Sequence, residues 1–247
     1  MIFEYKNGME LPEYLPDITH FICNKTDIKK LPEMPNLEIL ECLHTKLKNI
    51  PYFPKLIKLL CSMTHITHIP EFQNLKLLIC KLSHITNIPY LPNLRVLDCS
   101  HTKVTNIPYL PNLRILDCSY SQVTNIPEFP DLKILNCSGT KITNIPELPN
   151  LIELWCNGTK FRNIPYLQNL EKIHTNRRFY FMEGTNIPEY EVIDNKLHPH
   201  PKGEYIKSLA LSLHNKHALT RNSMRDPLKI LREMLFDEDE IYEDEYY

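Results

Sequence analysis

Glycine, alanine and tryptophan are scarce in this sequence. Its 247 residues include five glycines, one tryptophan and two alanines, Ala210 and Ala218. Five glycines leave little material for a phosphate-binding loop, and there is no P-loop, GxSxG, GxGxxG or paired-carboxylate motif. We therefore expect a protein that binds another macromolecule, with no enzymatic activity and no cofactor.

A strong net charge and long apolar runs are also missing. The formal net charge is −2, which favours neither nucleic acid nor an acidic membrane surface. The first residues, Met1 to Lys6, do not resemble a secretory signal. No charge-free apolar stretch approaches the roughly 18 residues that a membrane-spanning helix needs. These observations predict a chain that binds no nucleic acid and contacts no membrane.

Cysteine is present in a regular pattern. Successive cysteines are 19 residues apart throughout, at Cys23, Cys42, Cys61, Cys80, Cys99, Cys118, Cys137 and Cys156. Zinc frameworks use close pairs such as C-x-x-C, and the sequence has none. One cysteine per period therefore indicates a repeat, and we expect no metal site.

Each period repeats the same pattern of residues. The unit from Leu94 to Asn112 reads LRVLDCSHTKVTNIPYLPN, and the next reads LRILDCSYSQVTNIPEFPD. The same register runs back to Ile18 and forward to Leu170. The apolar positions fit the pattern L-x-x-L-x-L-x-x-N/C-x-L, with Thr102 where asparagine is usual. A repeat of this kind predicts a solenoid.

The side-chain period of a strand assigns a structure to each unit. Residues 96–100 are predicted to form a short parallel strand, with Leu97 and Cys99 pointing inward. Thr102 then begins a turn, and a hydroxyl there can bond the backbone of that turn. The return segment has two prolines, which exclude a helix and favour polyproline-like turns. One unit is too small to bury a core alone, so we expect the units to stack.

The recurring pattern IPxLPNLxxLxC resembles that of the leucine-rich-repeat family over about residues 9–176. It is most similar to the short repeats of bacterial effectors of the YopM and IpaH type, and to repeat proteins of giant amoeba-infecting viruses. The resemblance implies a leucine-rich-repeat solenoid, a horseshoe or arc with a parallel β-sheet on its concave face and proline-rich turns on its convex face.

The sequence departs from that family in three ways. Its 19-residue unit is shorter than the usual range of about 20–29 residues. Too few residues precede the first unit for the helical cap of the effectors. The IpaH proteins carry a ligase domain with a catalytic cysteine beyond their repeats, and no cysteine follows Cys156 here. The ligase activity is therefore not carried over.

The chain divides into four parts. These are an N-terminal cap (1–17), leucine-rich repeats (18–176), a C-terminal capping region (177–236) and an acidic tail (237–247). Apolar side chains at helical spacing in 206–213, and the helix-start signal Asp226-Pro227, predict short helices in the capping region. The tail holds seven acids and no basic residue. It is either a solvated end or an arm that screens a basic surface or recruits a partner.

The inward cysteines are expected to act as small buried hydrophobes, with disulfides or metal thiolates as the alternative. So many unpaired thiols indicate a reducing compartment, and we expect a cytoplasmic protein, a host-cell cytoplasm included. The histidine pairs His65-x-x-His68 and His198-Pro199-His200 are expected in turns and loops. Neither has cysteine or carboxylate partners at ligand spacing.

The outward strand positions form the candidate binding site, because the repeat pattern does not require them to be apolar. The expected partner-binding residues are Leu60, Leu77, Ile79, Val96, Asp98, Ile115, Asp117, Ile134 and Trp155. A contiguous apolar patch marks an interface, and tryptophan is enriched in binding hot spots. Two alternatives remain: β-branched residues simply suit strands, or the C-terminal helix of the chain covers these positions.

We expect a monomeric protein-interaction module that binds a protein partner through its concave face. One alternative, which the effector resemblance implies, is an adaptor that selects substrates for a host modification system. Another is a structural component of a viral particle. Nucleic-acid binding is least favoured, because the two concave columns lack stripes of lysine and arginine with interleaved aromatics. Fold alone does not identify the partner.

Overall fold

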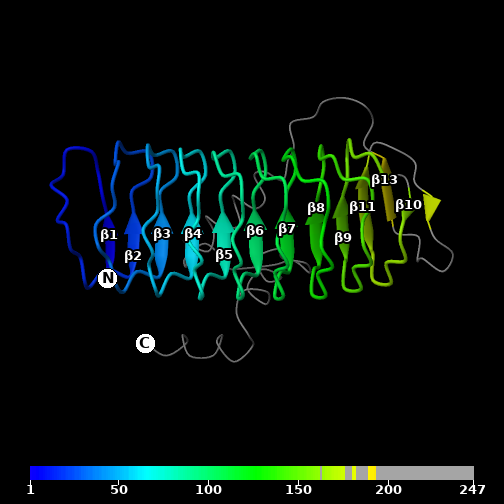
Figure 1. The fold of residues 1–247 in the computed structure, drawn as a ribbon, viewed down its shortest axis with the longest axis horizontal. Helices are drawn as coiled ribbons and strands as arrows, with labels where there is room; N and C mark the ends of the chain where they lie inside the picture. Colours follow the sequence, from blue (N-terminus) through cyan, green and yellow to red (C-terminus); the bar gives the residue numbers. More distant parts are fainter. Residues whose placement is uncertain (162, 176–179, 182–188, 193–247) are drawn as a thin grey trace, which may run out of the picture. The chain divides into compact units, whose positions relative to one another are not determined.

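Short parallel strands, one per coil, form the framework of the molecule (Figure 1). The computed structural model describes residues 1–161, 163–175, 180–181 and 189–192. The main sheet has 11 strands in the order β1-β2-β3-β4-β5-β6-β7-β8-β9-β11-β13, and β10 pairs with β12 in a second sheet. The bounds are β1 (Ile2–Glu4), β2 (His20–Ile22), β3 (Ile39–Glu41), β4 (Lys58–Leu60), β5 (Leu77–Ile79), β6 (Val96–Asp98), β7 (Ile115–Asp117), β8 (Ile134–Asn136), β9 (Glu153–Trp155), β10 (Asn163–Ile164), β11 (Lys172–Thr175), β12 (Tyr180–Phe181) and β13 (Glu189–Val192).

The strands pair in a constant register. From β2 to β11, each strand residue lies opposite the residue 19 positions further along the chain, as Leu78, Leu97 and Leu116 do. Backbone bonds continue the ladder past the strands. The Cys99 N–H donates to the Asp117 carbonyl at 2.9 Å, and the His101 N–H donates to the Ser119 carbonyl at 2.8 Å. Each 19-residue unit is thus one coil, and the predicted leucine-rich-repeat solenoid is confirmed.

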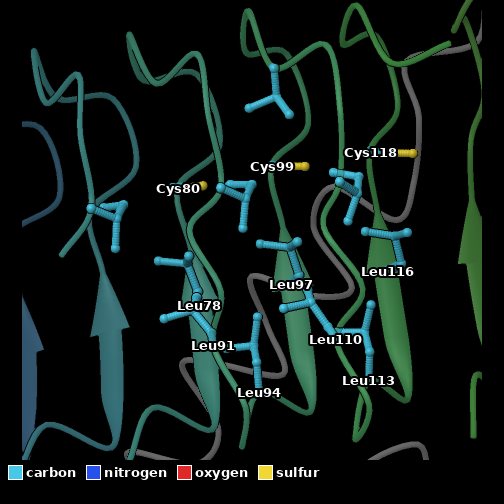
Figure 2. Packing of buried hydrophobic residues seen from close by; sticks show 14 of the residues in the cluster. Leu78, Cys80, Leu91, Leu94, Leu97, Cys99, Leu110, Leu113, Leu116 and Cys118 are labelled. Carbon is cyan, nitrogen blue, oxygen red and sulfur yellow. The ribbon is translucent and has the colours of Figure 1, made fainter. Parts of the chain in front are cut away.

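Leucine and cysteine side chains fill the interior of the coils. Figure 2 shows Leu97 and Cys99 of one coil beside Leu78 and Cys80 of the coil before it. All four side chains are fully buried and belong to one continuous apolar cluster that runs from Ile18 to Ile173. The inward orientation predicted from strand alternation is therefore confirmed. Stacking supplies the burial that a single coil lacks.

A hydroxyl residue closes the turn that follows each strand. Thr102 Oγ1 donates to the Cys99 carbonyl at 2.6 Å. The same bond recurs in all eight cysteine-containing coils at 2.5–2.9 Å. The preceding residue has a positive φ, 54° at His101 and 69° at Gly139. The hydroxyl thus gives the cysteine carbonyl a hydrogen-bond partner within the turn.

A ladder of asparagines joins the return segments of neighbouring coils. Asn112 Nδ2 donates to the Pro92 carbonyl at 2.7 Å, and Asn93 Nδ2 donates to the Gln73 carbonyl at 2.8 Å. Four further coils repeat this bond at 2.8–3.0 Å. We did not predict this ladder from the sequence. Proline-rich segments have few N–H donors, so a side-chain amide supplies the bond between coils instead.

The ends of the sheet depart from the 19-residue register. β1 lies opposite β2 with an offset of 18 residues (Ile2 opposite His20), and β13 lies opposite β11 with an offset of 17 (Lys172 opposite Glu189). Within the expected N-terminal cap, the Phe3 ring stacks on Phe21 at 5.6 Å.

Within the expected C-terminal capping region, the described residues are the strands β12 and β13, and β13 continues the main sheet past residue 176. The short helices and the acidic tail predicted there lie outside the described residues. In the described part of the chain, no helix has the length and apolar character needed to cross a membrane.

Candidate functional site

The outer face of the sheet consists of strand side chains on the side opposite the interior cluster. Its first column reads His20, Ile39, Lys58, Leu77, Val96, Ile115, Ile134, Glu153 and Lys172. Its second column reads Ile22, Glu41, Leu60, Ile79, Asp98, Asp117, Asn136, Trp155 and His174. None of these side chains belongs to the interior cluster. The structure therefore brings the nine expected partner-binding residues together, on β4 to β9.

The middle of this face has little exposure to solvent. Val96 is 1% exposed, Leu77 and Ile115 are 3% exposed, and only Ile134 among the expected apolar residues is half-buried. Ile39, Lys58 and Ile134, at other places in the same column, are half-buried. The expected patch is contiguous and apolar, but it is packed rather than open.

Polar side chains in the second column form a hydrogen-bonded ladder. Asp98 Oδ1 accepts from the Ser100 N–H at 2.9 Å and from Ser100 Oγ at 2.6 Å. Asp117 makes the same pair of bonds with Ser119 one coil later. Asn136 Nδ2 then donates to Asp117 Oδ2 at 3.0 Å. These two carboxylates thus anchor the turns that follow β6 and β7.

Two carboxylates lie side by side in this ladder, because Asp98 and Asp117 are register partners. Asp98 is 3% exposed, and its burial, with the negative charge of Asp117 added, raises its pKa from 3.8 to about 7. The bonds from Ser100 and the positive charge of Lys81 oppose that rise. Near neutral pH the pair therefore carries less negative charge than its two acids suggest.

Histidine and glutamate meet at both ends of the outer face. His20 Nε2 lies 3.1 Å from Glu41 Oε1 near the N-terminal end. His174 Nε2 lies 3.1 Å from Glu153 Oε1 near the C-terminal end. Trp155 donates its indole N–H to the same Glu153 oxygen at 2.7 Å.

Trp155, one of the expected partner-binding residues, lies on the outer face with its ring packed against a neighbour. It is 6% exposed and stacks on His174, with ring centroids 3.5 Å apart. We did not predict these polar end clusters, although their residues stand in the two columns. A column shows which side chains are neighbours, but the bonds depend on rotamers that periodicity does not reveal.

A row of cations precedes the strands. The position directly before strands β3 to β9 and β11 reads Glu38, Ile57, Lys76, Arg95, Arg114, Lys133, Ile152 and Glu171. We call the four central cations, Lys76 to Lys133, the basic stripe. Backbone bonds hold it in register, since the Arg95 N–H donates to the Lys76 carbonyl at 2.9 Å and the Arg114 N–H to the Arg95 carbonyl at 2.8 Å.

Strand alternation did not predict the basic stripe, because its cations fall one position outside the two strand columns. The signal that would have identified it is present in the sequence, as one cation every 19 residues over four consecutive units. All four side chains are half-buried.

The eight in-register cysteines have thiols of low reactivity. All eight thiols are free and buried. Burial raises the pKa of Cys23 and of Cys156 to about 12, the charge of Glu41 contributing at Cys23. The thiolate is the reactive form of cysteine, so these residues act as apolar packing groups. The expected interior position is confirmed.

The described histidine pair shows no ligand arrangement. His65 is exposed and stacks on His84 at 5.2 Å, and His68 Nδ1 lies 2.8 Å from Thr67 Oγ1. His198 and His200 lie outside the described residues. Within residues 1–161 and 163–175, no group of three or more histidine, cysteine or acidic side chains is arranged to hold a metal ion.

Comparison with known proteins agrees with this fold. The family model described as Leucine Rich repeats (2 copies) matches residues 92–131 and 111–150. Among solved structures, YopM from Yersinia enterocolitica WA-314 is similar with a TM-score of 0.51 and 23% identity, over 75% of this chain and 51% of that chain. This likeness concerns the fold, and the chain spans about half the length of YopM.

Another similar structure is the functional domain of InlJ from Listeria monocytogenes, which includes a cysteine ladder. Its TM-score is 0.47 and its identity 21%, over 64% of this chain and 48% of that chain. The comparison with curated proteins gives no match. Repeat sequence, coil register and interior together define a leucine-rich-repeat solenoid.

Proposed function

We propose that this protein is a protein-interaction module that binds a partner through the outer face of its sheet. The observation that carries the proposal is the apolar centre of that face. Leu77, Val96 and Ile115 stand in register on β5, β6 and β7, outside the interior cluster that holds the coils together. Stacking of coils does not require apolar residues at these positions, so their apolar character supports a role of this face in packing against another polypeptide segment.

The test replaces the centre of the face without touching the interior. A chain with Leu77→Ser, Val96→Ser and Ile115→Ser should lose capture of its partner proteins in pull-downs from host-cell extract. Its far-UV circular dichroism should stay that of the parent chain. Retention of every partner by a folded triple variant contradicts the proposal.

A matched control lies in the turns of the same three coils. Thr86, Thr105 and Thr124 follow Leu77, Val96 and Ile115 by nine residues each, and all three are exposed. Changing them to lysine adds three charges to the same coils away from the outer face. This control should keep all the partners that the parent chain captures.

We also infer a reducing compartment, a cytoplasm, for this protein. Eight free thiols in one chain support it, because disulfides form readily in oxidising compartments. Protein isolated from its native cell under acid-quenched conditions should contain eight free thiols per chain after denaturation. A count below eight in such material contradicts the inference.

A further inference from the structure

Positive charge gathers in the turn segments that follow the strands and line one edge of the main sheet (Figure 1). The turn segments are residues 24–30, 43–49, 62–68, 81–87, 100–106, 119–125, 138–144 and 157–163. Asp27 is the only acid in their sequence. Their ten cations are Lys25, Lys29, Lys30, Lys46, Lys48, Lys81, Lys103, Lys141, Lys160 and Arg162. A chain with a formal net charge of −2 thus carries a surplus of nine positive charges in these segments.

Most of this charge is open to solvent. Eight of the turn lysines are exposed, and Lys81 is half-buried. Among the described residues, Lys46 is the only turn lysine with an ion pair, since its Nζ lies 3.0 Å from Asp27 Oδ1. The charge is densest on the first two coils, where Lys29 and Lys48 occupy equivalent positions. The turn segments therefore form a cationic edge, which attracts a surface of negative charge.

A ridge of large side chains runs along the same edge. The second residue of each turn segment has a positive φ, a conformation that suits glycine, as Gly139 and Gly158 show at 69° and 70°. Met63, Leu82 and Tyr120 occupy the same position with φ of 54–56°, although a Cβ strains it. Their side chains are 39%, 40% and 49% exposed. Strained apolar side chains in contact with solvent add little to the fold, so they indicate a surface that meets a partner.

We propose that the turn edge binds the surface of a membrane that contains anionic phospholipids. The lysines pair with the negative headgroups, and Met63, Leu82 and Tyr120 enter the boundary between headgroups and acyl chains. Backbone bonds between turns, such as that from the Tyr120 N–H to the Ser138 carbonyl at 2.8 Å, keep successive turns level. Several turns can therefore meet a flat surface together. This site is separate from the outer face and goes beyond the proposed function.

The composition of the edge favours a membrane over a nucleic acid. A single nucleic-acid strand is held by cations together with aromatic platforms for its bases. Met63 and Leu82, on adjacent coils of the ridge, are neither cationic nor aromatic, and they suit acyl chains instead. Every described cation of the edge is a lysine, a mobile point charge without the two-pronged phosphate contact of arginine. The expectation that the chain contacts no membrane rested on its net charge, which conceals how the charges are distributed.

The test is sedimentation of the full chain with phosphatidylcholine vesicles that contain about 30% phosphatidylserine, at low ionic strength. The chain should bind these vesicles, should bind less as salt is added, and should not bind vesicles of phosphatidylcholine alone. Lys29→Gln with Lys48→Gln should lower the partition coefficient roughly 25-fold, because one lysine near an anionic surface contributes about fivefold. The matched control is Lys55→Gln with Lys172→Gln, which removes the same charge from exposed positions outside the turn segments. Its binding should stay within about twofold of the parent chain.

Met63→Gly with Leu82→Gly separates binding from folding. The midpoint of urea unfolding should stay at or above that of the parent chain, because relief of backbone strain offsets the extra freedom that glycine gives the unfolded chain. Vesicle binding should fall about tenfold, since less apolar area enters the membrane. A lower midpoint with unchanged vesicle binding would show that these side chains serve the fold, and the ridge would have no part in binding.

Four results would overturn the inference as a whole. They are no binding to the anionic vesicles, equal binding to phosphatidylcholine alone, equal effects of the lysine variant and its control, and tighter binding of a uridine oligonucleotide that depends on Lys29 and Lys48. Capture of protein partners through Leu77, Val96 and Ile115 is measured on a different face, so either proposal can fail while the other stands.

Discussion

Asp98→Asn should make the protein more stable above pH 7 and change its stability little near pH 4. Asp98 is buried next to Asp117, and its pKa rises from 3.8 to about 7 on folding. The folded state therefore holds this proton more strongly than the unfolded state does. Its contribution to stability is fully present below about pH 4 and is lost as the pH rises through about 7.

The size of the effect follows from the same two values. One pKa unit corresponds to about 1.36 kcal/mol, so the difference between 3.8 and about 7 sets a ceiling of roughly 4 kcal/mol at pH 8. The amide is neutral, and its oxygen can still accept both bonds from Ser100. Asn136 shows the geometry, since it donates to Asp117 at 3.0 Å and accepts from the Ser138 N–H at 3.2 Å. We expect a gain of roughly 1–3 kcal/mol at pH 8 after local rearrangement.

The measurement is urea unfolding of parent and variant at constant ionic strength, at pH 5, 6, 7 and 8. The difference in midpoint should grow with pH. Asn136→Asp is the matched control in the opposite direction, because it places a third carboxylate in the same ladder and should destabilise the chain at pH 8. The reasoning fails if the Asp98→Asn difference does not change with pH, or if that variant is less stable at pH 8.

Three further perturbations test the coils themselves. Gly158→Ala should lower the free energy of unfolding in urea by about 1–2 kcal/mol, because the φ of this residue is 70°. Gly139→Ala should lower it by about 1 kcal/mol more, because the added Cβ would also lie 2.7 Å from the Tyr120 ring. Equal losses of stability in the two variants would show that the contact with the ring has no effect. Asn112→Ala should cost about 1 kcal/mol, as it removes the 2.7 Å bond to the carbonyl of the preceding coil, and an unchanged midpoint would contradict a role for that ladder. Maleimide at pH 8 should modify almost none of the eight thiols in native protein and all of them in urea, whereas rapid native modification of several would refute the buried ladder.

The fold was predictable because the same constraint is repeated many times. Leu97 and Cys99 point inward for a reason that applies to every unit, so the 19-residue period determines coil, register and interior together. The bonds made by individual side chains were less accessible. The stacking of Trp155 on His174 and the link from Asn112 to Pro92 depend on rotamers and on turn geometry. A hydrophobicity period contains no information on either.

The sequence predicted which residues lie on the candidate face, but it did not predict how exposed their side chains are. All nine residues lie on one face, yet Val96 and Trp155 are buried there instead of open to solvent. Strand alternation says which side a residue faces, and it does not say how closely the neighbours pack. The cations before the strands were overlooked because Arg95 and Arg114 fall one position outside the strand columns.

The constant register has a consequence for the length of the chain. The coils from β2 to β9 contact one another through the same backbone ladder, so excision of residues 94–112 as a block would join two coils whose edges already match. Loss of a single residue within a strand would instead turn leucines toward water and charges toward the interior. Within these coils the protein can therefore lengthen or shorten by whole turns without loss of register, and relatives that differ in the number of coils should differ there by multiples of 19 residues.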